Sequence, residues 1–199
     1  MDHSFGTVGV LLALVTLLGC SRGGQSVSAA PPPVNESPVP PSSAGELLPL
    51  PAQDSVGWLV SDSSARTAEL TLEVTRPANS PSALLNGYQG GKAQVTVPLG
   101  WTVRWNWRNA DSAASHSLVV MVQREKVPLE GGRAAFSNAM TRSVTDGLAA
   151  GQTDQTTFVA EDAGWYWLMC GVPSHALEGE WIELRVDPEA KVARVQVKS

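Results

Sequence analysis

Hydrophobic and polar residues alternate along much of the second half of the chain. The clearest run covers residues 101–108, where tryptophan and valine alternate with threonine, arginine and asparagine. Residues 69–74 show the same period, with Leu70, Leu72 and Val74 at the hydrophobic positions. A period of two residues is typical of strands with one buried face. Shorter runs predict further strands at 95–97, 117–123, 156–159, 165–169, 181–186 and 193–197. Short strands separated by turns predict an all-β protein built as a β-sandwich.

One long segment, residues 123–151, interrupts this alternation. It contains Pro128, the pair Gly131 and Gly132, and mixed polar residues. We interpret it as an excursion between two strands and expect one short helical turn at residues 134–140. The chain also has seven tryptophans, but no Lys/Arg-rich groove of the kind that accompanies a base-stacking surface. We therefore expect the tryptophans to pack in the core between the two sheets.

The N-terminal region contains a hydrophobic run of 11 residues, Val8 to Leu18. This is about half of the 20 residues that cross a bilayer as a helix, and it is typical of a signal-peptide core. Residues 1–7, however, lack the Lys or Arg with which signal peptides normally begin. The run ends at Leu17-Leu18-Gly19-Cys20, which resembles the bacterial lipobox and so implies that Cys20 is lipidated. An ordinary cleavage site at residues 28–30 is the alternative, but it lies far beyond the hydrophobic run.

A proline-rich segment follows the expected leader. Residues 21–54 hold eight of the 14 prolines and almost no aromatic residues, so they cannot build a core. Such a composition favours extended polyproline II geometry and a semi-rigid spacer. We therefore divide the chain into a lipoprotein signal peptide (1–19), the lipidated Cys20 with a disordered linker (20–55), and one folded domain (56–199).

Composition and charge narrow the class of protein. With 43% hydrophobic and 17% charged residues, the chain can form an ordinary packed core. Without its leader it carries 14 basic and 18 acidic side chains, a mild negative charge that argues against nucleic acid as a partner. The length left after the leader and linker leaves room for one domain and argues against a multidomain enzyme. Cys20 and Cys170 are the only cysteines, so lipidation of Cys20 would leave no internal disulfide.

The candidate chemistry rests on three scarce side chains. Beyond the leader the chain has two histidines, His116 and His175, and one further thiol, Cys170. His116 precedes one predicted strand, Cys170 closes another, and His175 lies in the loop that follows. Two imidazoles and a thiolate form the ligand set of a blue-copper site. Taken singly, each residue is more often structural, and a lone buried cysteine is usually a small hydrophobic residue. Because the three residues together make a complete ligand set, we favour metal ligation over three separate structural roles.

The surrounding motifs strengthen the copper interpretation. They are Asn86-Gly87-Tyr88, Val97-Pro98-Leu99-Gly100-Trp101, His116-Ser117-Leu118-Val119, and Cys170-Gly171-Val172-Pro173-Ser174-His175-Ala176 with Gly179 and Trp181. In this order and spacing they resemble the cupredoxin family, and within it the sulfocyanins. The resemblance implies a Greek-key β-sandwich, one mononuclear copper ion, one-electron transfer, and His116, Cys170 and His175 as copper ligands.

The chain departs from the family at the axial ligand. The family places a methionine five residues after the second histidine, and here that residue is Glu180. A carboxylate is a harder ligand that favours Cu(II), so a coordinating Glu180 predicts a low reduction potential and a spectrum shifted from blue toward green or red. In the alternative, Glu180 points into water. Neither Met121 nor Met169 is placed to substitute for the missing methionine, and the sequence does not place Met140.

The ligand loop also predicts contacts outside the metal centre. We expect the Gly171 and Val172 amides to hydrogen-bond the cysteine sulfur, and Ser115 or Ser117 to restrain the segment that carries His116. Around the exposed ring edge of His175, residues Val172, Pro173, Ala176 and Leu177 would form an apolar rim. Such a rim suits brief docking of a redox partner protein, because these encounters bury little surface.

The leading functional prediction is an exported electron carrier. Lipidation at Cys20 would anchor it to a bacterial membrane, facing the periplasm or the cell exterior. Three alternatives stay open. If Glu180 swings away, the open copper position predicts a redox enzyme or a site for a small ligand. Copper storage or delivery would predict easy metal loss to a chelator. A metal-free interaction module would keep its activity when Cys170 is replaced.

Overall fold

The computed structural model describes residues 52–53 and 56–198. The expected signal peptide, Cys20 and nearly all of the proline-rich linker lie outside this part. Within it all regular secondary structure is β, and it holds no helix long and apolar enough to cross a membrane. The strands are β1 (Ala52–Gln53), β2 (Leu59–Asp62), β3 (Thr67–Thr75), β4 (Leu84–Leu85), β5 (Ala93–Pro98), β6 (Thr102–Asn109), β7 (Val119–Val122), β8 (Thr153–Val159), β9 (Gly164–Met169), β10 (Trp181–Asp187) and β11 (Arg194–Val197).

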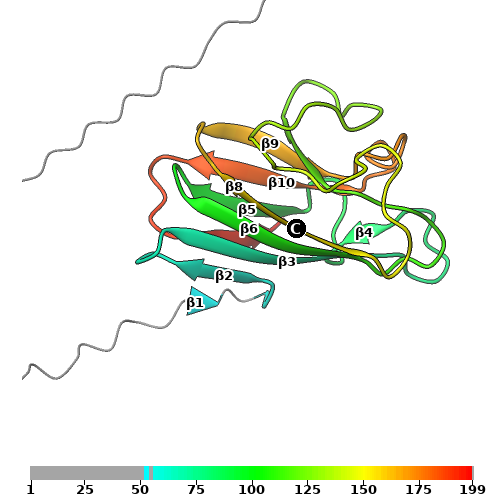
Figure 1. Ribbon diagram of the computed structural model, residues 1–199, viewed down its shortest axis with the longest axis horizontal. Helices are drawn as coiled ribbons and strands as arrows, with labels where there is room; N and C mark the ends of the chain where they lie inside the picture. The colour runs from blue at the N-terminus through cyan, green and yellow to red at the C-terminus, as the bar shows by residue number, and fades with distance from the viewer. Residues whose placement is uncertain (1–51, 54–55, 199) are drawn as a thin grey trace, which may run out of the picture. The chain divides into compact units, whose positions relative to one another are not determined.

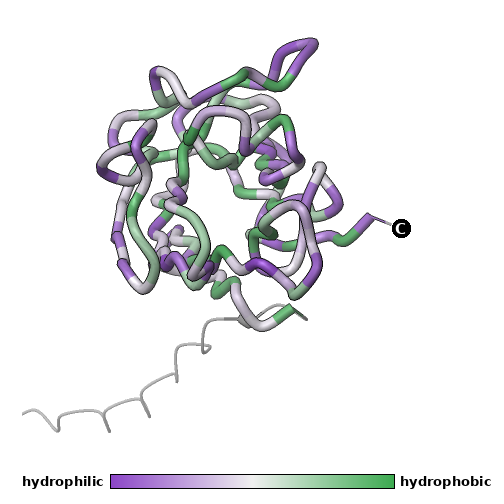
Figure 2. The backbone as a smooth tube through the Cα atoms, turned by 90° about the vertical axis from the view of Figure 1, so that its right-hand side faces the viewer, coloured by the Kyte–Doolittle hydropathy of each residue, from purple (hydrophilic) through white to green (hydrophobic). Residues whose placement is uncertain are grey.

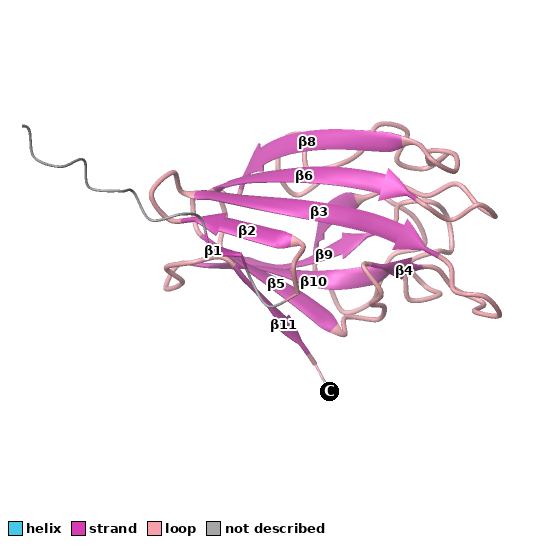
Figure 3. Ribbon diagram, turned by 90° about the horizontal axis from the view of Figure 1, so that it is seen from below, coloured by secondary structure: helices cyan, strands magenta, loops and turns pink. Residues whose placement is uncertain are grey.

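The strands form two sheets that face each other (Figures 1 and 3). One sheet has the order β1-β2-β3-β6-β8, with β4 paired to β3, and the other has the order β11-β5-β10-β9-β7. The pairs β3/β6 and β5/β10 are parallel, and the remaining pairs are antiparallel. From β5 to β9 the chain changes sheet at every connection, as in a Greek-key sandwich. The expected all-β sandwich is confirmed.

The two clearest alternating patterns form the centre of the first sheet. In β3 the side chains of Leu70, Leu72 and Val74 are buried, and in β6 those of Trp105 and Trp107 are buried. The strands pair so that Leu70 lies beside Trp105 and Leu72 beside Trp107. A view along the strands shows hydrophobic and hydrophilic segments mixed around the whole sandwich (Figure 2). The tryptophans of β6 therefore lie in the core, as predicted, whereas Trp165 is 44% exposed and Trp167 packs in a separate cluster.

The predicted strand boundaries need small corrections. Trp101 precedes β6, because its N–H donates to the carbonyl of Pro98 in a turn (3.2 Å). Gly100 lies in that turn with φ of 76°, a conformation that glycine adopts without strain. The sequence pattern missed β1, β2 and β4. In β2 the buried Ser61 stands at an inward position and accepts a hydrogen bond from the Ala193 N–H, so the alternation of hydrophobic residues is broken there.

The excursion at residues 123–151 contains no helix, so the predicted helical turn at 134–140 is wrong. Its backbone instead pairs with the edge strand β7: the Ala135 N–H donates to Val120, and the Val120 N–H donates to Ala139. These hydrogen bonds use N–H and carbonyl groups that would bond to one another within a helix. The ring of Phe136 stacks on Phe158 of β8, with 5.6 Å between the ring centroids. The excursion thus helps to fill the core between the sheets.

Part of the excursion also covers the outer face of the second sheet. A small cluster of buried residues lies there, consisting of Val119, Trp167, Met169 and Ala176. Val127, Ala134 and Val144 of the excursion pack against this cluster. Because Ala176 belongs to the loop that joins β9 to β10, the excursion packs directly against that loop.

Candidate metal centre

The three predicted metal-binding segments meet at one end of the sandwich. His116 lies just before β7 and exchanges two backbone hydrogen bonds with Leu148 of the excursion (3.1 and 2.7 Å). Cys170 follows β9 directly, and Glu180 immediately precedes β10. The Cys170 N–H donates to the Glu180 carbonyl (3.0 Å), which closes the base of the loop between them. The Glu180 N–H donates to the carbonyl of His175 (3.1 Å), so His175 is also fixed relative to Glu180.

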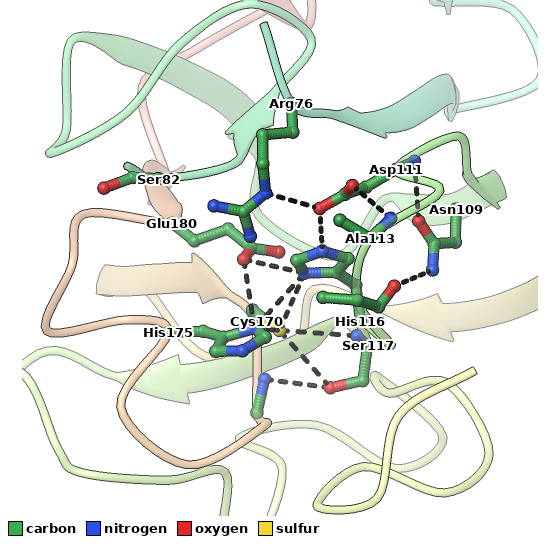
Figure 4. Close-up of polar contacts among 12 residues, drawn as sticks. Arg76, Ser82, Asn109, Asp111, Ala113, His116, Ser117, Cys170, His175 and Glu180 are labelled. Carbon is green, nitrogen blue, oxygen red and sulfur yellow. Dashed lines mark hydrogen bonds and ion pairs between the residues drawn. The ribbon is translucent and has the colours of Figure 1, made fainter. Parts of the chain in front are cut away.

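Four side-chain donor atoms converge at this point (Figure 4). The sulfur of Cys170 lies 3.9 Å from Nδ1 of His116 and 3.5 Å from Nδ1 of His175. The two Nδ1 atoms are 3.2 Å apart. Oε2 of Glu180 lies 2.8 Å from Nδ1 of His116 and 3.3 Å from Nδ1 of His175. All four donor atoms lie within 4.8 Å of one another. The structure therefore brings together every residue that the sequence proposed.

Glu180 points into this group and not into water. Its side chain is 4% exposed, so the solvent-facing alternative is wrong. Its second oxygen, Oε1, is buried without a hydrogen-bond partner among the described residues. A buried carboxylate oxygen without a partner is costly, and a cation in the centre of the group would remove that cost.

The acid–base properties of the group also favour a bound cation. Burial works to raise the pKa of the Glu180 carboxyl, but hydrogen bonds with His116 and His175 hold that pKa below its ordinary value. Burial works to lower the pKa of His116, but Glu180 raises that pKa above its ordinary value. Without a metal, a proton on His116 thus supplies the positive charge that Glu180 needs. Burial, followed by the negative charge of Glu180, raises the pKa of the Cys170 thiol, so metal binding must displace its proton.

Two backbone amides donate hydrogen bonds to the Cys170 sulfur. One of them was predicted from the sequence, and the other was not. The Ser117 N–H donates to Sγ of Cys170 (3.4 Å), and the Val172 N–H is a second donor to it. The Gly171 N–H was expected to bond the sulfur, but it donates to the Ser117 hydroxyl (2.9 Å). That hydroxyl in turn donates to the carbonyl of Val144 (2.6 Å). Ser117 therefore links both ligand segments to the excursion.

The exposure of the ligand loop matches most of the predicted rim. The side chain of His175 is 18% exposed, Val172 is half-buried and Pro173 is exposed. Leu177 is 58% exposed. Ala176, in contrast, is 1% exposed because it packs in the outer cluster with Trp167 and Met169, so its place in the rim was a wrong expectation. Leu129 of the excursion, which is 56% exposed, joins this surface: its carbonyl accepts a hydrogen bond from the Ser174 N–H (2.8 Å).

Sequence reasoning missed two residues behind His116. Oδ2 of Asp111 lies 2.9 Å from Nε2 of His116, and Nε of Arg76 donates to the same oxygen (2.8 Å). Burial works to raise the pKa of Asp111, but hydrogen bonds from the Ala113 N–H, His116 and Arg76 lower it to about 2. Asp111 is therefore a carboxylate at neutral pH. The proximity of Asp111 and His116 in the sequence was the only available signal.

The donor set fits copper. Thiolate sulfur suits Cu(I), imidazole nitrogen suits both oxidation states, and the Glu180 carboxylate would supply a fourth donor atom. Each methionine considered as an alternative has a different environment. Met121 accepts a hydrogen bond from the Gly132 N–H (3.4 Å), Met140 is 42% exposed, and Met169 packs in the outer cluster. Among these candidates, Glu180 is thus the residue whose side chain lies with those of His116, Cys170 and His175.

Comparisons with known proteins agree on one family. The family model described as the sulfocyanin (SoxE) domain matches residues 55–194. A sulfocyanin from Sulfolobus acidocaldarius is 28% identical over 129 residues, which cover 61% of this chain and 64% of that protein. The chain thus aligns with somewhat less than two thirds of that relative.

The solved structures to which the chain is similar include auracyanin, rusticyanin and a copper-containing nitrite reductase. Auracyanin from Roseiflexus castenholzii is 23% identical, with 59% of this chain and 97% of that chain covered (TM-score 0.41). Rusticyanin from Thiobacillus ferrooxidans is 16% identical, with 66% and 89% covered (TM-score 0.44). A copper-containing nitrite reductase from Thermus scotoductus is 19% identical, with 61% and 28% covered (TM-score 0.44).

Proposed function

The chain belongs to the sulfocyanin domain family of cupredoxins, and from this premise we propose that it is an exported carrier of single electrons. The observation that carries the proposal is the convergence of His116, Cys170, His175 and Glu180 on one point at the end of a rigid sandwich. When bound there, copper supplies the one-electron change between Cu(II) and Cu(I). Family and donor set both fit one mononuclear copper ion.

Three of the four residues are buried and fix the position of the centre, and the fourth connects the centre to the surface. His116, Cys170 and Glu180 are buried and tied to the sandwich by backbone hydrogen bonds, so they keep their positions when the charge of the centre changes. His175 is the partly exposed member. A redox partner can approach its ring edge without any opening of the site. Little rearrangement is therefore needed for electron transfer.

An apolar surface surrounds His175 and supports the proposal of a docking site. We call it the His175 patch and define it as Leu129, Val172, Pro173 and Leu177. Two of these side chains, Leu129 and Leu177, are large and more than half exposed. A small apolar patch around a partly exposed ligand suits the brief encounters of redox proteins, which bury less than about 1,200 Å². We propose that the electron partner docks here.

The proposal also includes a membrane anchor. The hydrophobic run at 8–18 and the lipobox-like sequence ending at Cys20 support export and lipidation. The proline-rich segment at 21–51 supports a semi-rigid tether between anchor and domain. Mass spectrometry of the protein from a bacterial host tests this part. A diacylated N-terminal Cys20 is expected, and a chain that begins at residue 31 would contradict the anchor.

The buried position of Glu180 favours a carrier over the alternative of an open copper site. A small ligand such as azide needs a free coordination position, and the carboxylate occupies that side of the group. Copper titration, voltammetry and azide addition test the proposal together. We expect one copper per chain, a reversible one-electron wave and a spectrum that azide leaves unchanged. Loss of the metal to a mild chelator, or a spectrum that changes with azide, would contradict a closed electron carrier.

A further inference from the structure

We infer that Asp111, held in place by Arg76, is a positioning residue of the metal centre that strengthens His116 as a ligand for the oxidised metal. This inference rests on the proposed copper site and assigns part of its reduction potential to a residue that does not touch the metal. It goes beyond the ligand set, because neither Asp111 nor Arg76 contributes one of the four converging donor atoms.

The contact between Asp111 and His116 fixes the tautomer of the ring. His116 directs Nδ1 toward Cys170, His175 and Glu180, while its Nε2 lies 2.9 Å from Oδ2 of Asp111 (Figure 4). Both side chains are almost fully buried, at 0% and 2% exposure, so water does not compete for the contact. An ionised carboxylate is only an acceptor, so Nε2 must carry the proton. When a metal displaces the proton that Nδ1 shares with Glu180, Nδ1 offers the lone pair that ligation requires, while Nε2 keeps its proton.

Asp111 is itself held from three sides. Arg76 donates from Nε to Oδ2 (2.8 Å) and from Nη1 to the carbonyl of Pro81 (2.6 Å), which fixes the guanidinium. The Ala113 N–H donates to Oδ1 (2.8 Å), and the Asp111 N–H donates to Oδ1 of the fully buried Asn109 (2.9 Å). Neither the carboxylate nor the ring of His116 can turn without breaking these bonds. The group is therefore preorganised before any metal arrives.

The negative charge of Asp111 has an electronic consequence for the centre. A carboxylate that accepts a hydrogen bond from a ligating imidazole makes the imidazole a stronger donor. The stronger donor stabilises the more highly charged Cu(II) and so lowers the reduction potential. In the described part of the chain, His175 makes its contacts through Nδ1, and its partly exposed ring has no corresponding carboxylate behind it. Asp111 thus acts on one histidine of the pair.

The substitution Asp111→Asn tests the inference in the full copper-loaded chain. Asparagine keeps the shape and can still accept a hydrogen bond, but it removes the charge. The matched control is Asp154→Asn, which removes the charge of another buried aspartate that pairs with an arginine, Arg142 (2.9 Å), without contacting the four donor residues. Voltammetry measures the potential, and pulsed spin resonance measures the coupling of the remote imidazole nitrogen.

We expect Asp111→Asn to weaken Cu(II) binding at least tenfold relative to Cu(I), which raises the potential by about 59 mV or more. The coupling of the remote nitrogen of His116 should change as well. The control should match the wild type in both measurements. An unchanged potential and an unchanged coupling in Asp111→Asn, even with reduced thermal stability, would reduce Asp111 to a structural role and overturn the inference.

A second variant decides the matter if Asp111→Asn does not fold. Arg76→Gln removes the cation and leaves the carboxylate facing His116, so the potential should fall. A rise or no change would overturn the inference. The wild-type spectrum separates this outcome from a failure of the proposed function. If the wild type lacks a sulfur-to-copper charge-transfer band, the copper site itself is wrong. If the band is present and the variants do not shift, only the role of Asp111 is wrong.

Discussion

Glu180 gives the centre its distinctive chemistry at the scale of single residues. Its carboxylate is buried, one oxygen faces both imidazoles, and the other has no partner among the described residues. Compared with a thioether, a carboxylate stabilises the more highly charged oxidation state. The residue that occupies this position should therefore set much of the potential.

Replacing the carboxylate by a thioether should raise the reduction potential. Each tenfold gain of Cu(I) over Cu(II) binding corresponds to about 59 mV, and we expect Glu180→Met to gain at least that much. The charge-transfer spectrum should move toward that of a blue-copper protein. Voltammetry and absorption measure the two effects. The exposed neighbour Glu178 provides the control Glu178→Met, and equal potentials in all three proteins would show that Glu180 does not act on the metal.

Copper uptake should release protons because burial raises the pKa of the Cys170 thiol in the metal-free protein. At pH 7 the thiol is protonated, whereas the ligand is the thiolate. Apparent copper affinity should therefore rise with pH between 6 and 8, by about tenfold per pH unit for each proton released. Competition with a chelator of known pH dependence measures this slope. A flat affinity over that range would mean that the thiol is not a ligand.

The ligand residues could be predicted from the sequence, but their support could not. His116, His175 and Cys170 are scarce and fall in motifs of fixed spacing, so few assignments were open. Arg76, in contrast, is one of 14 basic residues and lies 35 positions from Asp111 along the chain. Only the pairing of β3 with β6 brings their two ends together. Such a contact leaves no periodic signal in the sequence.

At the scale of elements, the excursion determines how firmly the ligand loop is held. The Gly131 N–H donates to the Gly171 carbonyl (2.8 Å), and the Ser174 N–H donates to Leu129. A Cβ atom on Gly131 would lie 2.4 Å from a methyl group of Val144 and 2.7 Å from the Cα of Gly171. Only a residue without a side chain allows this close approach between the excursion and the loop.

Adding one methyl group at this contact should therefore loosen the metal centre. We expect Gly131→Ala to destabilise the protein by about 1–3 kcal/mol, as overpacking does, and to broaden the copper spectrum. Gly132→Ala is the control, because its nearest neighbour would be Met121 at an ordinary 3.6 Å. Denaturant unfolding and spin resonance measure both variants. Equal stability of the two would show that the excursion does not constrain the loop.

The elements themselves were partly predictable, and the physical reason differs between them. β3 and β6 bury one face each, so their alternation was clear in the sequence. β1 and β4 have only two residues each, too few to show a period. The helical turn was wrong because Ala135 and Ala139 bond through their backbone to Val120 of β7, a tertiary effect that no local pattern reports.

At the scale of the whole molecule, the His175 patch is the proposed docking site for a redox partner, and its role can be tested by substitution. Replacing Leu177 with Asp should slow electron self-exchange between two copies about tenfold, as for the loss of about 1.4 kcal/mol at an interface. The reduction potential should stay the same, because Leu177 is more than half exposed. Nuclear magnetic resonance line broadening in mixtures of the two oxidation states measures the rate.

The exposed Val192 offers a matched control for that experiment. It follows β10, whose other end begins next to Glu180, so it lies away from the metal end of the strand. Val192→Asp introduces the same negative charge at another exposed apolar position. It should leave the rate of self-exchange nearly unchanged. Equal slowing by both variants would attribute the effect to net charge and not to the patch.

We propose that Cys170, His116 and His175 together hold one copper ion through the sulfur and two imidazole nitrogens. Visible absorption and spin-resonance spectra of the copper-loaded protein, compared with Cys170→Ser, test it most directly. In the wild type we expect an intense sulfur-to-copper charge-transfer band, shifted from blue toward green or red by the Glu180 carboxylate, and this band should be absent from the variant. Identical spectra for the two proteins would contradict it.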